Sequence, residues 1–575
     1  MTSRSRVLGL AAALVIVGAT VPAAIAMSDR DGQSSKPWSF GVMDDTQWTV
    51  AADAANPNAV SVSIINQINP QFIKAGVKFV VQVGDLIENG NDADLAVRAA
   101  AAQPLYNAGI GFYPMRGNHE TSASPANNFA IPAFQADFPQ TRGVGNTFGA
   151  RNFSSPTSVS ADLTGMSYSF DYGTPGNNAR FVIVDPWVTP SKNVAPGNGY
   201  NYGYSIADQQ SWISSRLNEK TRGTTQAFVF SHQPLIAENH QDSPFVGQTY
   251  ANPDMQNAFY ASLQANDVKY YISGHDHMDQ RSIVTSPDGK SQVQEIIGAS
   301  DSSKFYTPKA PSNAGWIDPV SLVNQKSRET SIAQDLYSIG YYIYTIDGPR
   351  VTVDYYADDH GNWASDNCYP DGATPAACSV AGSQVTPALN FVKKSTWGYS
   401  LNGKEFLVGG ATSPSYTSVK DSFDGTTAKI LGGTYKNTAA DFTGRVLTQA
   451  VDTGWTADTK RDELSSNILT LWGMAPLGTT TTDTYALSMS FDAGKGGHDG
   501  FANLGVLAAK DAKGKWVKAV DLNAGGVQRF VVGPWQPQDT LGTYGVDPAT
   551  NTAWAVVNYN GSFAVDRGTD LVWKH

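Results

Sequence analysis

Polar side chains that can bind metal ions follow apolar runs at five places in the chain. In "YYISGHDH", His275 and His277 stand one residue apart, and the whole chain has only 8 histidines. Imidazole, carboxylate and carboxamide groups together are ligands for ions such as Fe, Mn or Zn. The other candidates, in chain order, are Asp45 with Gln47, Asp85, Asn118 with His119, and His232. A lone aspartate after a strand is more often a turn or capping residue, so only the whole set indicates a metal centre.

An α/β fold would position these side chains. The apolar runs "WSFGVM", "KFVVQVGD", "GFYPMRGN", "RFVIVD", "AFVFSH" and "KYYISGH" predict buried strands, and helical patterns alternate with them. We expect helices over residues 58–76, 93–109, 207–220 and 254–267. Ligands of open α/β sheets collect outside the carboxyl ends of the strands. The polar residues should therefore meet in one crevice.

Two further stretches complete the expected domain. After His277, "VQEIIGAS", "YYIYTID" and "VTVDYYA" predict strands that close a sheet. Residues 121–178 are rich in Asn, Ser, Thr, Pro and Gly, which predicts a long loop insertion.

The five segments, in this order, resemble the calcineurin-like metallophosphoesterase superfamily. That family carries D-x-H, G-D, G-N-H-[DE], H and G-H-x-H, and the resemblance covers roughly residues 38–357. It implies an α/β (α+β) fold of two packed sheets with flanking helices. It also implies hydrolysis of phosphate mono- or diesters by a hydroxide formed between two metal ions about 3.5–4 Å apart.

The resemblance assigns a role to each candidate. Asp85 would bridge two divalent or mixed-valence ions (Fe, Mn or Zn). The first ion would be bound by Asp45, Asp85 and His277, with Gln47 as a further ligand, and the second by Asp85, Asn118, His232 and His275. His119 would contact the phosphoryl group and help to protonate the leaving oxygen. Asp276 is expected to orient His119 or one of the metal ligands.

Three positions depart from the pattern or lie beside it. Gln47 stands where the superfamily usually has histidine, so it is either a ligand or a hydrogen-bonding neighbour. Glu88 stands where purple acid phosphatases have tyrosine, which disfavours that branch. His240 is a candidate for the substrate mouth, with a solvated loop position as the alternative.

The remaining chain predicts export and a second domain. Residues 1–26 combine Arg4 and Arg6, an apolar run and a small-residue end, which is typical of a cleaved signal peptide of a secreted or periplasmic protein. We assign residues 37–365 to the metallophosphoesterase domain, 366–389 to a linker and 390–575 to a smaller all-β domain. Cys368 and Cys378, the only 2 cysteines, predict a disulfide in the linker.

Composition limits the classes of partner that the protein is expected to bind. The formal net charge is −11 and no long basic run occurs, which argues against binding of duplex nucleic acid. No segment after residue 26 is long and apolar enough to span a membrane. Besides the phosphoesterase, two functions stay open: a 5′-nucleotidase-like enzyme, and a weakly catalytic metal-binding domain that serves a surface- or glycan-binding β domain. The substrate, the metal pair and the oligomeric state are not specified by the sequence.

Overall fold

The structure is a computed structural model of the 575-residue chain. It describes residues 36–47, 60–121, 130–188, 206–245, 253–318, 322–359, 388–401, 419–420, 426–433, 441, 443–445, 447, 451–456, 464–479, 483–493 and 505–566. The predicted signal peptide, the two cysteines and nearly all of the predicted linker lie outside these residues.

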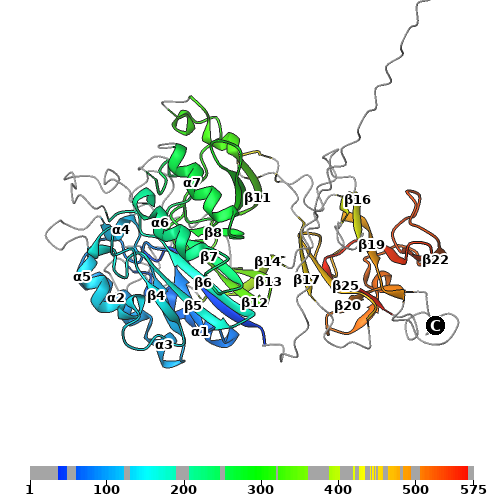
Figure 1. Ribbon diagram of the computed structural model, residues 1–575, viewed down its shortest axis with the longest axis horizontal. Coiled ribbons are helices and arrows are strands. Elements are labelled where there is room, and N and C mark those ends of the chain that lie inside the picture. Colours follow the sequence, from blue (N-terminus) through cyan, green and yellow to red (C-terminus); the bar gives the residue numbers. More distant parts are fainter. Residues whose placement is uncertain are drawn as a thin grey trace, which may run out of the picture. The chain divides into compact units, whose positions relative to one another are not determined.

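The first sheet has the strand order β14-β13-β12-β1-β2-β3. Its strands β12, β13 and β14 are labelled in Figure 1. Strands β1 (Trp38–Met43), β2 (Phe79–Gln82) and β3 (Gly111–Pro114) are parallel to one another. Strand β12 (Gly340–Asp347) pairs antiparallel with β1, and β13 (Arg350–Asp358) and β14 (Phe391–Ser400) extend the sheet antiparallel. The carboxyl ends of β1, β2 and β3 therefore lie at one edge.

The second sheet has the order β11-β9-β10-β8-β7-β6-β5-β4. Its parallel centre is formed by β6 (Asn177–Ile183), β7 (Gln226–Phe230), β8 (Tyr270–Ser273) and β10 (Gln292–Ile297). Strands β4 (Arg151–Ser154), β5 (Tyr168–Thr174), β9 (Asp279–Thr285) and β11 (Glu329–Asp335) flank it antiparallel.

An aromatic core joins the two sheets. Phe40 of the first sheet packs edge-on against Phe181 and Phe228 of the second, with ring centroids 4.9 and 5.2 Å apart. Phe79 stacks beside Phe40 at 5.5 Å and meets Phe181 at 5.0 Å. Rings of this size bury large apolar areas and prefer edge-to-face or offset contacts, so they fix the spacing of the sheets.

Helices cover the outer faces of both sheets. On the first sheet, α1 (Val62–Ala75) buries Ile64, Ile65, Ile68 and Phe72, which a helical period places on one face. It is followed by α2 (Asp92–Ala101), α3 (Gln103–Asn107) and, beyond the short α4 (Asn118–Thr121), α5 (Ile131–Asp137). Helices α6 (Ile206–Leu217) and α7 (Pro253–Gln264) cover the second sheet (Figure 1). Within the described residues no helix is long and apolar enough to cross a membrane.

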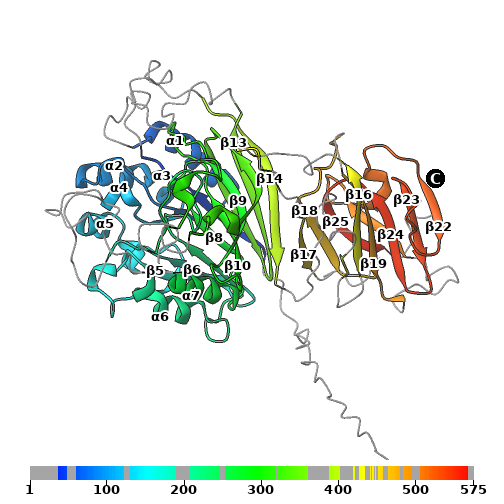
Figure 2. The ribbon, with the colours of Figure 1, turned by 90° about the horizontal axis from the view of Figure 1, so that it is seen from above.

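The C-terminal region consists of strands and short turns around a core of its own. One sheet has the order β15-β16-β19-β24-β23-β22 and the other β17-β18-β25-β20-β21. Figure 2 labels β16, β19, β24, β23 and β22 of the first and β17, β18 and β25 of the second. The first contains β15 (Val419–Lys420), β16 (Thr427–Gly433), β19 (Asp483–Ser490), β22 (Arg529–Val532), β23 (Thr543–Asp547) and β24 (Thr552–Val557). The second contains β17 (Asp452–Thr456), β18 (Ile468–Trp472), β20 (Val506–Lys510), β21 (Trp516–Lys518) and β25 (Gly561–Asp566). The expected fold class, a two-sheet α/β domain with flanking helices and a following β-rich region, is confirmed.

Two sequence expectations differ from the structure. The prediction of a long loop over residues 121–178 is wrong, because this stretch contains α5, β4 and β5. Short turns rich in Gly and Asn separate these elements. In the sequence, the turn residues outnumber the buried Tyr168 and Phe170 of β5 and hide the strand. Residues 391–400, which the sequence boundary at 390 assigned to the C-terminal domain, form β14 and pair with β13 in the first sheet.

Candidate metal centre

The predicted metal ligands lie just beyond the carboxyl ends of β1, β2, β3, β7 and β8, on loops except for Asn118, which begins α4. Backbone hydrogen bonds tie these loops to one another. The amides of Thr46 and Gln47 donate to the carbonyl oxygen of Asp85 at 3.0 and 3.1 Å. The amide of Gly274 donates to the carbonyl oxygen of His232 at 3.0 Å. Loops from both sheets are thereby held in one place.

The backbone at three ligand positions is strained. Asp85, His275 and His277 have φ angles of 43°, 77° and 51°, in the left-handed region that costs free energy for residues other than glycine. Such a conformation persists only where its surroundings enforce it. Here it turns all three side chains into the crevice.

The first donor cluster consists of Asp45, Gln47, Asp85 and His277. The carboxylates of Asp45 and Asp85 and the ring of His277 place one ligand atom each within 4.8 Å of the others. Nε2 of Gln47 lies 2.9 Å from His277 Nε2 and 3.2 Å from Asp85 Oδ2. All four side chains are buried.

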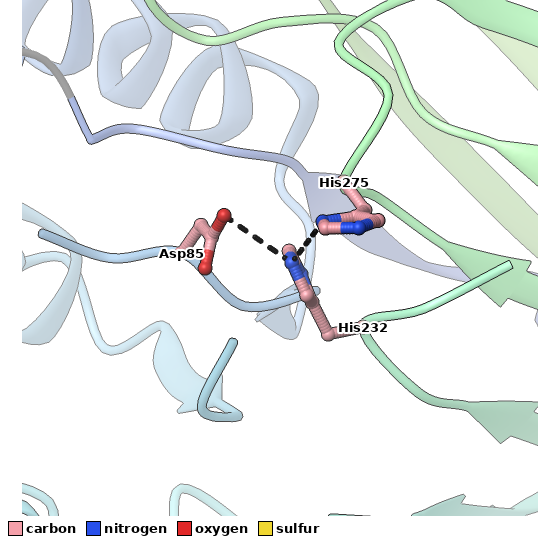
Figure 3. Close-up of side chains that lie close together, drawn as sticks. All are labelled: Asp85, His232 and His275. Carbon is pink, nitrogen blue, oxygen red and sulfur yellow. Dashed lines mark hydrogen bonds and ion pairs between the residues drawn. The ribbon is translucent and has the colours of Figure 1, made fainter. Parts of the chain in front are cut away.

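The second donor cluster consists of Asp85, Asn118, His232 and His275. Nε2 of His232 lies 3.0 Å from Asn118 Oδ1, 3.1 Å from His275 Nδ1 and 3.2 Å from Asp85 Oδ2. In Figure 3 the side chains of Asp85, His232 and His275 point toward one another from three separate loops. Four atoms with lone pairs thus face one small volume.

Asp85 belongs to both clusters through one oxygen atom. Its Oδ2 lies 3.2 Å from Gln47 Nε2 in the first cluster and 3.2 Å from His232 Nε2 in the second. Its Oδ1 accepts a hydrogen bond from the backbone amide of His119 at 3.0 Å. This geometry suits a carboxylate that bridges two cations.

The second cluster stabilises a protonated imidazole, whereas in the first cluster burial and the neighbouring Lys304 lower the pKa of His277 well below its usual value. Burial alone would lower the pKa of His232, but the carboxylates of Asp85 and Asp45 raise it to about 10. Burial would raise the pKa of Asp85, yet His232 and His119 hold it well below its usual range. Burial raises the pKa of Asp45 to about 7 in spite of the neighbouring histidines. Without added cations, the second cluster therefore favours a proton on the ring of His232, which lies between the carboxylates of Asp85 and Asp45.

Two motif glycines leave room for ligands from other loops. A Cβ atom on Gly117 would lie 2.0 Å from Oδ1 of Asp85, and one on Gly274 would lie 2.4 Å from Oδ2 of Asp45. Both distances are far below van der Waals contact. The glycines before Asn118 and His275 therefore serve close packing of the carboxylates, in addition to the tight turns that the sequence predicts.

The residues present fit metal ions. Oε1 of Gln47 is buried and has no hydrogen-bond partner among the described residues, while its Nε2 faces the two donor atoms. The amide oxygen and nitrogen have nearly the same shape, so a half-turn of the amide would direct the oxygen to the cluster. Mixed imidazole, carboxylate and amide donors suit transition ions.

His119 lies at the open side of the clusters. Its side chain is 21% exposed, and Nδ1 lies 2.8 Å from the carbonyl oxygen of Glu88. A carbonyl only accepts hydrogen bonds, so Nδ1 carries a proton and Nε2 is the atom that can gain or lose one. Nε2 lies 3.9 Å from Asp85 Oδ2, which places it beside the shared oxygen.

Asp276 and His240 are hydrogen-bonded to each other. The carboxylate of Asp276 accepts hydrogen bonds from the amides of Glu238, Asn239 and His240, and from Nδ1 of His240 at 2.7 Å. These hydrogen bonds of Asp276 hold residues 238–240. The ring of His240 packs on His275 with centroids 4.0 Å apart, so His240 is not a solvated loop residue.

Two acidic residues that the sequence analysis did not single out support the clusters. Glu120 is buried and accepts hydrogen bonds from the amides of Gly117 and Ile87, at 2.5 and 3.0 Å. Asp242 is buried and its Oδ1 lies 3.0 Å from His275 Nε2. Glu120 occupies the [DE] position of the G-N-H-[DE] pattern, so the sequence carried a signal for it. Asp242 has no spacing signal, because only the folded loop brings it to His275.

Comparison with known proteins identifies the domain. Residues 59–279 match the family model of the calcineurin-like phosphoesterases. The matched segment contains Asp85, Asn118, His119 and the three histidines of the clusters, and Asp45 and Gln47 precede it. No curated protein matches the chain.

Solved structures of similar fold are distant. A dimetal phosphatase from Danio rerio has a TM-score of 0.34 and 17% identity, over 55% of this chain and 95% of that chain. The purple acid phosphatase from yellow lupin (Lupinus luteus) seeds has 0.36 and 17%, over 62% and 57%. The structure of PhoD has 0.37 and 11%, over 64% and 70%. At such TM-scores these similarities carry no argument about activity.

The family match and the ordered strand-end ligands agree on one conclusion. The chain carries a calcineurin-like phosphoesterase domain, which makes it a metal-dependent phosphoester hydrolase.

Proposed function

We propose that the chain is an exported phosphoesterase that hydrolyses phosphate mono- or diesters with two metal ions held by the two donor clusters. The observation that carries the proposal is the shared oxygen of Asp85, 3.2 Å from a donor of each cluster. The first cluster would hold one ion and the second cluster the other. When bound, such ions polarise the phosphoryl group and lower the pKa of the attacking water.

The protein's own groups would then do three things. Asp85 keeps its carboxylate oxygen between the two clusters, because its other oxygen is fixed by the amide of His119. His119 presents Nε2 to the leaving-group oxygen and delivers a proton there, because its Nδ1 proton is committed to the carbonyl of Glu88. The strained turns at His275 and His277 pre-organise both rings before substrate arrives.

The test compares metal content and turnover in one preparation. The purified chain is loaded with Mn²⁺, Fe²⁺ or Zn²⁺ and assayed with p-nitrophenyl phosphate, bis(p-nitrophenyl) phosphate and a nucleoside 5′-monophosphate. We expect about two ions per chain and hydrolysis of at least one ester class. Asp208→Asn, at an exposed position in the first turn of α6, is the matched control for aspartate variants in the clusters. A fully loaded chain that hydrolyses none of the esters would contradict the proposal and favour the weakly catalytic binding protein.

The substrate panel also separates the 5′-nucleotidase-like alternative. Strong preference for the nucleoside monophosphate over both aryl esters would favour it. No contact among the described residues singles out a nucleoside site, so the general phosphoesterase is the function we propose.

Export rests on the sequence of residues 1–26 alone. The charged start, the apolar run and the small residues at 24–26 support cleavage after Ala26. N-terminal sequencing of the exported protein should begin at Met27. Recovery of the full-length chain inside the cell would contradict this part of the proposal.

A further inference from the structure

We propose that Asp242 is a positioning residue that orients His275 and strengthens it as a ligand of the second donor cluster. The inference rests on the proposed function, because it concerns an ion held by that cluster. Asp242 lies ten residues after His232, in the loop that follows β7, and 33 residues before His275.

The two ring nitrogens of His275 face two different partners. Nε2 lies 3.0 Å from Asp242 Oδ1, and Nδ1 lies 3.1 Å from His232 Nε2 inside the second cluster. An ionised carboxylate can only accept a hydrogen bond, so Nε2 carries the proton in this pair. The lone pair of the neutral ring then belongs to Nδ1 and points to the cluster.

The other two histidines of the clusters have weaker outer partners. Nδ1 of His232 lies 2.9 Å from the carbonyl oxygen of Val83, and Nδ1 of His277 lies 2.8 Å from that of Lys304. A carbonyl fixes the tautomer of the ring as a carboxylate does, but it carries no net charge. A carboxylate makes the stronger hydrogen bond and raises the basicity of the coordinating nitrogen further.

Asp242 is itself held in place. It is 6% exposed, and the side-chain amide of Gln233 donates to its other oxygen. The residues before it are fixed by Asp276, which accepts hydrogen bonds from the amides of residues 238–240. The ring of His240 packs on the face of His275. His275 is therefore contacted both at its Nε2 edge and on one face by a single loop.

The consequence is an asymmetry between the two ions. His275 belongs only to the second cluster, so loss of the Asp242 carboxylate should weaken the ion of that cluster and leave the other ion unchanged. A residue that only stabilised the fold would weaken both or neither.

The experiment titrates the full-length chain with Co²⁺ and follows both the binding isotherm and the visible absorption of the bound ion. For Asp242→Asn we expect one of the two dissociation constants to rise about 10–100-fold, the effect typical of such outer partners. The absorption bands of that ion should shift, and the second constant should stay near its wild-type value. Asp242→Glu, which retains the carboxylate, should recover most of the loss, and Asp208→Asn should match the wild type.

Two outcomes would overturn the role of Asp242. One is a wild-type isotherm and spectrum for Asp242→Asn. The other is an isotherm in which both ions weaken equally in Asp242→Asn and Asp242→Glu.

If Asp242→Asn does not fold, the wild-type protein gives the answer through histidine-selective NMR with Zn²⁺ bound. A strongly downfield Nε2 proton on His275, assigned by its loss in His275→Gln, is expected. An Nε2 without a proton would overturn the proposal. Failure of the wild type to bind any ion would instead contradict the proposed function.

Discussion

The two donor clusters share Asp85 but are built from unequal parts. Beside Asp85, the second cluster has two histidines and the side-chain oxygen of Asn118, and one of its rings is backed by a carboxylate. The first has one histidine, Asp45 and the amide of Gln47, and its ring is backed by a backbone carbonyl. Similar ligand counts therefore conceal different ligand strengths, and the second cluster should bind its ion more tightly.

The first prediction concerns Asp85, the residue that both clusters share. Asp85→Asn takes away the charge that faces both clusters and leaves the three buried histidines without it. We expect loss of both ions and a fall in turnover beyond the range of about 10²–10⁴-fold that is typical for a single general acid. Elemental analysis and ester hydrolysis measure the two effects. If one ion stays bound at wild-type affinity, Asp85 does not bridge the clusters.

The second prediction concerns His119, which belongs to neither donor cluster. His119→Ala should keep both ions and lower turnover about 10²–10⁴-fold, because in the proposed function His119 protonates the leaving group through Nε2 and is not a metal ligand. The fall should be smaller for an ester with an activated leaving group such as p-nitrophenol than for an alkyl ester, since the former needs little protonation. Loss of metal from His119→Ala would show that His119 acts as a ligand.

Sequence reasoning located the clusters because each ligand directly follows a strand. Strand ends are readable from apolar runs, and parallel strands bring their ends to one edge, so Asp85, His232 and His275 could be expected together. The contacts that the loops make beyond the strand ends could not be predicted from the sequence. Asp242 reaches His275 on a loop that is held by Asp276, Glu295 and Gln233, and no local pattern encodes these contacts. Asp276 was expected to orient His119 or a ligand, and it holds His240, whose ring packs on His275.

The fold was predictable to a similar degree. The parallel strands and the helices between them are long apolar or periodic segments. Strand β5 was missed although aromatic residues alternate at Tyr168, Phe170 and Tyr172, because the polar residues beside them are buried too. Ser169 is buried, and Asp171 pairs with Arg180 at 2.6 Å. A buried ion pair inside a sheet defeats the usual rule that polar residues mark the solvent side.

The third prediction concerns the first cluster, which should bind its ion less tightly. In the first cluster, Gln47→His would replace an amide by an imidazole, the better donor to transition ions. Nε2 of Gln47 is already 2.9 Å from His277 Nε2, so a ring at this position would reach the cluster. We expect the affinity of the weaker ion to rise about 10–100-fold, with little change in the tighter ion.

The measurement is a metal titration of wild type and Gln47→His at one pH with Mn²⁺, Fe²⁺ and Zn²⁺. Asn66→His, at an exposed position on α1, controls for binding of metal by an added histidine. Identical affinities of wild type and Gln47→His for both ions, across all three metals, would place Gln47 outside the ligand sphere.

The last and smallest effect concerns the loop that carries His232 and Asp242. Glu295 of β10 anchors this loop, because its carboxyl group accepts hydrogen bonds from the amides of Leu235 and Ile236, the latter at 3.2 Å. Burial raises the pKa of Glu295 to about 8, although the two amides oppose the shift. In the unfolded chain its pKa is about 4.3, so between these values the folded protein holds a proton that the unfolded chain has released. The free energy of unfolding therefore falls as pH rises through this window.

Glu295→Gln removes this titration. The unfolding free energy of wild type minus that of Glu295→Gln should decrease by a few kcal/mol between about pH 4.5 and 8, since one pKa unit corresponds to about 1.4 kcal/mol. Chemical denaturation of the metal-free proteins across this range measures the difference and avoids the pH dependence of metal binding. The exposed Glu219→Gln should keep the wild-type slope. Parallel curves for wild type and Glu295→Gln would mean that Glu295 is ionised in the folded protein, with the loop amides and nearby Lys326 outweighing its burial.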